Sequence, residues 1–466
     1  MTKVIDRLKS IECEFLVKQI VVDRQSFWPF FRIFVYAQLL EGLLMVFDHG
    51  YGSVFRKLKN SFFGFRHWFS RYDYVFISNE MERKKNDDNI IIDKLAEGLI
   101  QKLGYHNSLY IEQVNNGHLD SKNYGKKKVV SFDLILILAG FYKKIKKPGY
   151  KVLIEGEDIF REILRKYNLR HDYREGIDTF LSKVFAFETM FKHLRPKAIF
   201  ITDYGNIAAT YAAHKLGIRV IEFQHGVIGD GHPYYHPAVK LNDFFCPDYL
   251  LVFGMNDVKA LSHGNYVSAP NIVPVGNYYL SILTDKEVNK NIVNLIDGYE
   301  KSVCVPTDHA THGYLSRFFQ SLAHQLPNYV FIISPRQLRL ATDTYDFPKN
   351  VKVITDYSFQ EIVRHCDFNS STNSTCCIEA LALGARNILI DEDGLASQYF
   401  GRILTDVEIT RFVRSKEEYI NNIKSMPFLS RIEVKRRNEG NYMDNYDQRI
   451  SSFSTLLIKS ASGFKR

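Results

Sequence analysis

Short apolar runs alternate with helix-length stretches along the chain from about residue 70 onward. DYVFIS (73–78), SLYIE (108–112) and DLILILAGF (133–141) have the apolar character of strands, and KLAEGLIQKLG (94–104) lies between two of them as a helix that Gly104 ends. Strands that alternate with helices in this way predict a parallel sheet with helices on both faces.

The pattern is clearest in the middle of the chain. KAIFIT (197–202) and RVIEFQ (219–224) are interpreted as strands joined by the helix NIAATYAAHKLG (206–217), and PDYLLVFG (247–254) as a further strand. A connector near VPVGNYY (273–279) closes this half of the chain.

A second series with similar spacing follows the connector. Its expected strands are SVCVPT (302–307), YVFIIS (329–334), VKVIT (351–355), CDFNS (366–370) and RNILID (386–391). The predicted fold class is therefore α/β, with two doubly wound, Rossmann-like domains whose polar edges face each other across a cleft. The expected parts are a helical N-terminal segment over 1–69, Rossmann-like domains over 70–275 and 276–430, and a helical tail over 431–466.

Polar side chains directly follow several of these strands. Because ligands of an open parallel sheet bind beyond the carboxyl ends of its strands, such residues are candidates for a site. Asp203 follows KAIFIT and His225 follows RVIEFQ, and a right-handed crossover keeps these two strand ends on one edge. In the second domain, His309 and Arg336 follow expected strands in the same way.

The segment NSSTNSTCCIEALALG (369–384) places hydroxyl and amide residues before a helix that Gly384 ends. A helix N-terminus presents unpaired N–H groups and partial positive charge, so the segment is a candidate phosphate site. Glu379 lies where it could reach a ribose. The alternative to a phosphate site is a simple N-cap of the helix, with Glu379 as a solvated side chain. The candidate hydroxyl residues are Ser370, Ser371, Thr372, Ser374 and Thr375.

EFQHGVIGDGHPYYHP (222–237) is a histidine-rich loop after an expected strand. His225, His232 and His236 have a spacing that a zinc site could use, but the loop is rich in glycine and offers no clear acid or cysteine partner. A buried histidine satisfied by backbone groups is a second interpretation. The third is a cleft histidine that donates to a phosphate or exchanges a proton near neutral pH. No metal site and no cofactor are predicted.

Composition narrows the class of protein. The chain has 466 residues, 45% of them apolar and 14% aromatic, which is enough for packed cores in two domains. The formal net charge of +9 suits an anionic membrane surface, an anionic substrate or nucleic acid, and no nucleic-acid-binding motif supports the last of these. The six cysteines lack paired spacing and are typical of free thiols in a reducing compartment.

FWPFFRIFVYAQLLEGLLMVF (27–47) is the most apolar segment. Arg32 and Glu41 interrupt it, and charges inside a spanning helix are costly, so no membrane span is predicted. A buried helix is the first interpretation. The alternative is a helix at a membrane interface, aided by the basic residues that follow it, which would give a peripheral membrane contact through residues 27–60.

FQHGV, PDYLLVFG, VPVGN and SSTNSTCCIEALALG together resemble the GT-B-fold glycosyltransferases of bacterial surface polysaccharide synthesis. The resemblance covers roughly residues 70–430 in layout. It is nearest to capsule and O-antigen enzymes, including those that transfer 3-deoxy-manno-octulosonic acid (Kdo) or sialic acid from CMP donors. The CDP-glycerol glycerophosphotransferases are a more distant match.

The resemblance implies a metal-independent enzyme that moves a sugar from a nucleotide donor to a growing polysaccharide or its lipid-linked precursor. Its expected location is the cytoplasm, at the inner face of the plasma membrane. The C-terminal domain would bind the donor, with the hydroxyl residues of 370–375 facing its phosphate or carboxylate and Glu379 facing its ribose. Many such enzymes carry a His-Pro pair where this chain has Ser334 and Pro335, which leaves a CMP-sugar donor in doubt.

By the same resemblance, His225 would lie near the reacting centre, with Asp203 as the base that accepts the acceptor proton. Glu157, in IEGEDIF, is a second candidate base. Arg336 and His309 would stabilise the leaving phosphate.

Three other functions are compatible with this pattern. One is the transfer of a polyol phosphate, and another is a nucleotide-sugar 2-epimerase, which would act on the donor without any acceptor. The third is a non-catalytic subunit of a polysaccharide-assembly complex.

Overall fold

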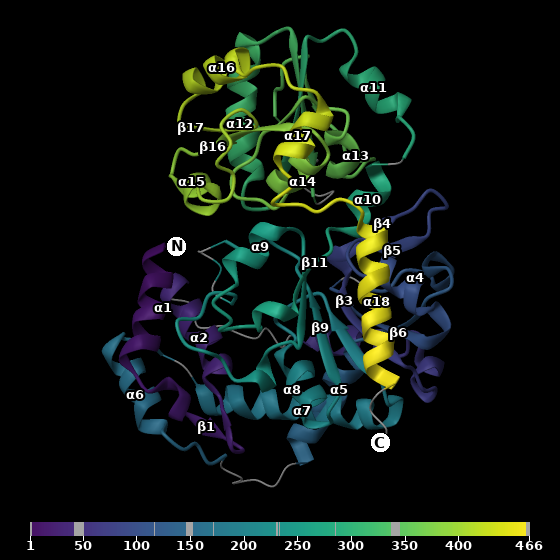
Figure 1. Ribbon diagram of the computed structural model, residues 1–466, viewed down its shortest axis with the longest axis vertical. Coiled ribbons are helices and arrows are strands. Elements are labelled where there is room, and N and C mark those ends of the chain that lie inside the picture. The colour runs from purple at the N-terminus through teal and green to yellow at the C-terminus, as the bar shows by residue number, and fades with distance from the viewer. Residues whose placement is uncertain are drawn as a thin grey trace. The chain divides into compact units, whose positions relative to one another are not determined.

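The computed structural model describes residues 2–41, 51–115, 117–145, 152–170, 172–229, 232, 234–284, 286–336 and 345–462. The chain divides into two compact units (Figure 1). Unit 1 comprises Met1–Val252, Val258–Tyr278 and Tyr446–Arg466. Unit 2 comprises Phe253–Asp257 and Tyr279–Asn445.

The core of unit 1 is a parallel sheet whose order, among the described residues, is β11-β10-β9-β8-β3-β6-β7. Its strands are short apolar runs buried on both faces, as parallel sheets require. The strands are β3 (Tyr74–Asn79), β6 (Ser108–Gln113), β7 (Lys128–Ser131), β8 (Ala198–Ile201), β9 (Arg219–Phe223), β10 (Tyr249–Val252) and β11 (Ile272–Pro274).

Alternate residues of these strands pack on opposite faces of the sheet. Val75 and Ile199 join the core formed with α5, α7 and α8, whereas the rings of Phe76 and Phe200 stack with their centroids 4.4 Å apart. The helices of unit 1 are α1 (Thr2–Glu14), α2 (Trp28–Glu41), α3 (Tyr51–Ser61), α4 (Glu97–Leu103), α5 (Asp133–Ile145), α6 (Glu157–Lys166), α7 (Tyr173–Leu194), α8 (Ile207–Lys215) and α18 (Tyr446–Ser462).

Two small antiparallel hairpins complete unit 1. One is formed by β1 (Val21–Val22) and β2 (Gln25–Ser26), and the other by β4 (Arg83–Lys85) and β5 (Ile91–Asp93). The chain passes between the units after Val252, inside α9 (Met255–Ala260), inside α10 (Tyr278–Thr284) and after Asn445.

Unit 2 is built around a second parallel sheet, with the order β14-β13-β12-β15-β16-β17 among its described residues. The strands are β12 (Lys301–Thr307), β13 (Tyr329–Pro335), β14 (Val351–Val353), β15 (Phe368–Asn369), β16 (Arg386–Ile390) and β17 (Thr410–Val413). The helices are α11 (Lys290–Ile296), α12 (His312–Leu322), α13 (Phe359–Val363), α14 (Cys376–Ala382), α15 (Leu395–Phe400), α16 (Lys416–Ser425) and α17 (Arg431–Arg437). The predicted fold class of two doubly wound, Rossmann-like α/β domains is confirmed.

Both sheets have the same winding. In unit 1 the chain runs outward from β3 through β6 to β7, then returns to place β8 on the other side of β3. In unit 2 it runs from β12 through β13 to β14, then returns to place β15 beside β12. Each sheet therefore has a switch point, where open α/β sheets bind ligands beyond the carboxyl ends of the strands.

The strand predicted over residues 133–141 is wrong, because this segment forms the first part of helix α5. The strand next to β6 is β7, which ends at Ser131, and the Ser131 hydroxyl accepts a hydrogen bond from the Asp133 amide at 3.2 Å where the helix begins. A short apolar run does not distinguish a buried strand from a buried helix, and leucine and alanine favour the helix.

The apolar segment predicted over residues 27–47 forms helix α2 as far as Glu41, and residues 42–50 lie outside the described part. Phe27, Trp28 and Phe31 are buried in the core of unit 1, which agrees with the first interpretation of a buried helix. Within the described residues, no helix has both the length and the apolar character needed to cross a bilayer.

Candidate functional site

The switch point of unit 1 is tied together by hydroxyl groups. Thr202, directly after β8, donates to the Ser78 hydroxyl at 2.9 Å, and Ser78 in β3 donates to a carboxylate oxygen of Asp93 at 2.6 Å. Asp93 is buried and also accepts a hydrogen bond from Tyr110 in β6 at 2.7 Å. Three parallel strands are thus held in a fixed arrangement just below the edge where a ligand would bind.

Asp203 and His225 lie at the carboxyl ends of the neighbouring strands β8 and β9, as the sheet rule predicts. The Asp203 carboxylate accepts a hydrogen bond from the Gly205 amide at 2.7 Å, which shapes the turn into α8. Burial lowers the pKa of His225, while the nearby charges of Asp203 and Glu82 oppose this shift. His225 is therefore favoured as a neutral imidazole beside a carboxylate.

One side of His225 is lined by an aromatic ring. Its ring centroid lies 5.0 Å from that of Tyr204, and Tyr204 lies 3.7 Å from Tyr234 on the loop that follows β9. The Nδ1 atom of His225 is buried and has no hydrogen-bond partner among the described residues. An apolar wall and a neutral imidazole suit a site that excludes water from a proton transfer.

The other two histidines of this loop occupy different environments. Burial lowers the pKa of His232 to about 3, so this side chain is neutral at physiological pH. The His236 Nδ1 lies 3.3 Å from the Nε2 of His263. Within the described part of the chain, no group of three histidine, cysteine or acidic side chains has an arrangement that could hold a metal ion.

Glu222 is a buried acid that the sequence prediction did not include. It lies in β9, three residues before His225, and its two carboxylate oxygens accept hydrogen bonds from Tyr235 at 2.7 Å and Tyr266 at 2.6 Å. Burial raises the pKa of Glu222 to about 7, although the two tyrosine hydroxyls favour its charged form. The only signal in the sequence is an acid inside an apolar strand, and it does not indicate the two tyrosines.

The N-terminal helices support the end of the same loop. Glu12 of α1 accepts hydrogen bonds from the Trp28 indole and the Arg32 guanidinium of α2, and its other oxygen accepts the Ala238 amide at 2.7 Å. Glu12 and Arg32 are both buried. The helical N-terminal segment is therefore part of the structure that positions the loop after β9.

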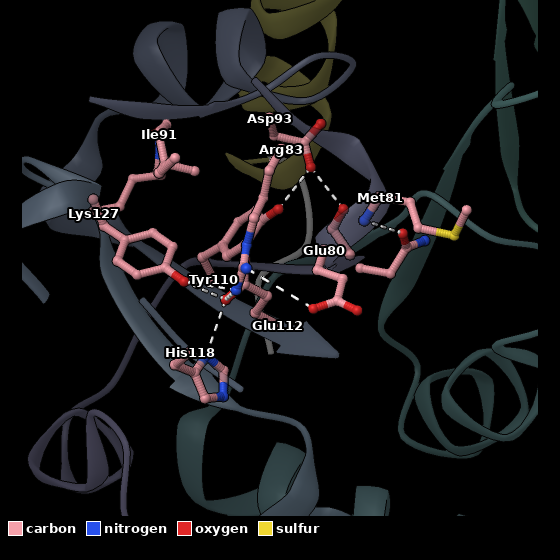
Figure 2. A network of polar contacts seen from close by, with 12 residues as sticks. Glu80, Met81, Arg83, Ile91, Asp93, Tyr110, Glu112, His118 and Lys127 are labelled. Carbon is pink, nitrogen blue, oxygen red and sulfur yellow. Dashed lines mark hydrogen bonds and ion pairs between the residues drawn. The ribbon is translucent and has the colours of Figure 1, made fainter. Parts of the chain in front are cut away.

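A second polar network lies beside the edge, at the end of β6 (Figure 2). Arg83 donates two hydrogen bonds of 2.7 Å to the carboxylate of Glu112, which also accepts one from Tyr124 and contacts the Nδ1 of His118 at 3.0 Å. Burial would raise the pKa of Glu112, but the bonds from Arg83, His118 and Tyr124 outweigh it and lower the pKa to about 2. This saturated carboxylate fixes the β4–β5 hairpin to the sheet.

Glu157 begins helix α6, in the segment between α5 and α7. Its carboxylate accepts hydrogen bonds from Arg161 at 3.0 Å and Arg174 at 2.6 Å, and also from the Tyr173 hydroxyl. Partial burial opposes ionisation, but these donors lower the pKa of Glu157 below its ordinary value. Glu157 is not at the carboxyl end of a strand, and its observed contacts are those of an ion-pair cluster.

In unit 2, His309 and Arg336 lie at the ends of the neighbouring strands β12 and β13. The backbone carbonyl of Thr307 accepts a hydrogen bond from the Arg336 amide at 2.8 Å, which holds the two strand ends together. Asp308 folds the following loop by accepting the Thr311 amide at 2.9 Å. The His309 and Arg336 side chains are exposed, so both are available to a ligand at this edge.

The hydroxyl residues after β15 divide into two kinds. Ser370 is fully buried, and its hydroxyl lies 2.7 Å from that of Tyr419 in α16; Ser371 is also buried. Thr372, Ser374 and Thr375 are half-buried. The latter three are therefore the hydroxyl groups accessible at the switch point, across from the end of β12.

Helix α14 is shorter than the sequence suggested, spanning only Cys376–Ala382, so its dipole makes a small contribution to anion binding. The Ser374 hydroxyl accepts a hydrogen bond from the Cys376 amide at 3.3 Å, in the turn just before the helix. Glu379 is buried and accepts a hydrogen bond from the Gln360 side chain at 2.8 Å.

No family model matches this chain, and no curated protein matches its sequence. Solved structures do match its fold. The glycotransferase of kitacinnamycin is 12% identical over 83% of this chain and 98% of its own, with a TM-score of 0.50. The glycosyltransferase SnogD from Streptomyces nogalater is 14% identical over 84% of this chain and 100% of its own, with a TM-score of 0.49. The UDP-GlcNAc 2-epimerase from Neisseria meningitidis, bound to UDP-GlcNAc, is 12% identical over 84% of this chain and 100% of its own, with a TM-score of 0.46.

At such identities the likeness concerns the fold alone. The two-unit architecture of this chain is one that a glycosyltransferase uses.

Proposed function

We propose that this protein is a glycosyltransferase that uses a nucleotide-activated sugar. The observation that carries the proposal is the switch point of unit 2, where exposed His309 and Arg336 end two neighbouring strands and accessible hydroxyl groups follow the strand on the other side. A guanidinium, an imidazole and hydroxyl donors at such an edge suit a nucleotide phosphate.

In this proposal unit 2 binds the donor. Arg336 and His309 pair with the phosphate, and the hydroxyl groups of Thr372, Ser374 and Thr375 donate to its oxygens or to a sugar carboxylate. Glu379 accepts from the ribose. Ser370 contributes through the packing of Tyr419, because its hydroxyl is already engaged there, and Ser371 through the shape of the loop.

Unit 1 supplies the proton acceptor. In the reaction the acceptor oxygen bonds to the anomeric carbon, and the bond from that carbon to the phosphate oxygen breaks with its electron pair leaving on the nucleotide. The acceptor proton passes to Asp203, with neutral His225 next to it to hold or relay the proton. Glu157 is a weaker candidate, since two arginines and a tyrosine already hold its carboxylate.

The finer assignment follows from the resemblance of the histidine loop and of residues 369–384 to capsule and O-antigen enzymes. We propose a growing surface polysaccharide or its lipid-linked precursor as acceptor, reached from the cytoplasmic side of the membrane. A CMP-sugar such as a Kdo or sialic acid donor is the first donor class to test.

The first test is nucleotide binding. The melting temperature of the purified protein is measured with CMP, CDP, UDP, GDP and dTDP, for wild type and for Arg336→Ala and Ser374→Ala. We expect one nucleotide to raise the melting temperature of the wild type and to lose most of that effect in both variants. Lys424→Ala removes an exposed cation elsewhere in unit 2 and serves as the matched control.

A second test separates the classes of reaction. The stabilising nucleotide is supplied as its sugar derivative, and release of the nucleotide is followed with and without acceptor glycans. A transferase needs the acceptor for fast release, whereas an epimerase converts the donor without one. Stabilisation by none of the five nucleotides would contradict the proposal and favour a non-catalytic subunit.

A further inference from the structure

Unit 1 exposes a continuous strip of large apolar side chains along α3 and the short 3-10 helix η2 (Phe65–Phe69). The strip consists of Phe55, Leu58, Phe62, Phe65 and Phe69, whose exposed fractions are 74%, 47%, 65%, 40% and 66%. The first three recur at helical spacing and so lie on one side of α3. The centroid of the Phe65 ring lies 6.1 Å from that of Phe62 and 5.1 Å from that of Phe69, which makes the strip continuous.

The opposite side of α3 is packed into the unit. Asn60 is buried and donates a hydrogen bond to Asp133 at the start of α5, with a distance of 3.0 Å. Gly64, between α3 and η2, has a φ of +64°, and a Cβ at this position would lie 1.8 Å from the Val129 carbonyl oxygen of β7. The strip is therefore a fixed surface of a docked element.

The strip is accompanied by uncompensated positive charge. Residues 51–72 contain Arg56, Lys57, Lys59, Arg66 and Arg71 and no aspartate or glutamate. Among the described residues, none of these five cations forms an ion pair. Burial and the nearby Lys57 lower the pKa of Lys183 on α7, which agrees with an excess of positive charge here.

We infer that the strip of α3 and η2 docks unit 1 on an anionic lipid surface, with its phenylalanines in the boundary between headgroups and acyl chains and its cations on the lipid phosphates. Exposed aromatic side chains flanked by lysine and arginine, without any acid, match an anionic bilayer in both polarity and charge. The membrane contact expected over residues 27–60 is narrowed by this inference to its α3 end and extended to η2, because Trp28 and Phe31 of α2, and Phe27 just before it, are buried in the core.

The test uses the full chain, without nucleotide, in flotation with vesicles of phosphatidylcholine alone or of phosphatidylcholine mixed with phosphatidylglycerol. We expect binding to the anionic vesicles that high salt weakens. Phe55→Ser combined with Phe69→Ser, and Lys59→Glu combined with Arg66→Glu, should each weaken it about tenfold or more. All four side chains are exposed, so these variants should fold.

Phe428→Ser combined with Ile432→Ser is the matched control, since these apolar side chains of unit 2 are 87% and 80% exposed. It should bind vesicles as the wild type does. Equal binding by the wild type and the Phe55/Phe69 variant would overturn the inference, as would a wild type that does not bind anionic vesicles. A dimer that the Phe55/Phe69 variant abolishes, without lipid binding by the wild type, would assign the strip to a second copy of this chain.

This inference does not depend on the proposed transferase activity. Nucleotide stabilisation should be the same in the Phe55/Phe69 variant as in the wild type. Failure of the vesicle test would leave the donor site of unit 2 untouched, and failure of the nucleotide test would leave the lipid surface untouched.

Discussion

The two units share a winding but use the edge at their switch points differently. In unit 1 the edge is underlain by buried titratable groups that already have partners, such as Asp93, Glu112 and Glu222. In unit 2 it presents small hydroxyls and the exposed side chains of His309 and Arg336. The comparison separates an edge whose buried acids are already hydrogen-bonded from an edge whose polar side chains remain exposed or half-buried.

The largest expected effect concerns the stability of unit 1. Glu112→Ala removes a fully buried carboxylate and leaves the half-buried Arg83 without it, and removal of one partner from a buried pair costs about 3–5 kcal/mol of the free energy of unfolding. Urea unfolding of wild type and variant measures this loss. The control is Glu433→Ala in unit 2, which removes a carboxylate that accepts from Arg436 and Arg437 at the surface. Equal losses in the two variants would contradict the contrast between buried and exposed pairs.

The second effect is a pH dependence that belongs to Glu222. Its pKa is raised by burial from the model-compound value of 4.5 to about 7, so the folded state holds a proton that the unfolded state has lost between these pH values. The contribution of Glu222 to the free energy of unfolding is fully present below pH 4.5 and is lost as pH rises through 7. The total loss is roughly 3 kcal/mol.

Glu222→Gln keeps the shape of the side chain and removes the titration. The melting temperature of the variant should therefore fall less than that of the wild type between pH 5 and pH 8, because the variant has no carboxyl proton to lose. Parallel curves for the two proteins would show that Glu222 does not titrate in this range.

A smaller effect distinguishes two serines of unit 2. Ser370→Ala leaves the buried Tyr419 hydroxyl without its partner and should cost about 1–2 kcal/mol of stability, with nucleotide binding retained. Ser374→Ala should cost less stability and weaken nucleotide binding. Thermal unfolding and nucleotide titration of both variants test this assignment of Ser370 to packing and Ser374 to nucleotide binding. Weaker nucleotide binding in Ser370→Ala and a larger loss of stability in Ser374→Ala would contradict it.

The smallest effect is electrostatic. Burial lowers the pKa of His225 and the Asp203 carboxylate opposes that shift, so Asp203→Asn should lower the His225 pKa further. NMR titration of the His225 ring proton reports this change. Asp88→Asn, in an exposed turn of the same unit, should leave the titration unaltered.

Much of the architecture can be predicted from the sequence, because the buried strands of both cores are short apolar runs of consecutive residues. The apolar runs of β3, β8, β9, β12 and β13 each lie within a predicted strand, and the sheet rule then brings Asp203 and His225 to one edge. The same reasoning misassigns residues 133–141, because an apolar run fits a buried helix equally well.

What escapes the sequence is the partner of each polar group. Ser370 and Ser374 are equivalent hydroxyls in the sequence, and only the packing of Tyr419, 49 residues beyond Ser370, separates them. Glu222 is likewise defined by tyrosines 13 and 44 residues away. Such pairs depend on the tertiary fold, so no local pattern reports them.

Helix α18 has a consequence for the order in which the protein can be completed during synthesis. It belongs to unit 1, where Asp447 pairs with Lys102 of α4 at 2.7 Å, although the whole of unit 2 precedes it in the chain (Figure 1). A ribosome that has added Asn445 has therefore synthesised every residue of unit 2, while the face of α4 that receives α18 is still uncovered. The unit that begins first is the last to be closed, and a nascent chain halted before Tyr446 would expose that face to chaperones and proteases.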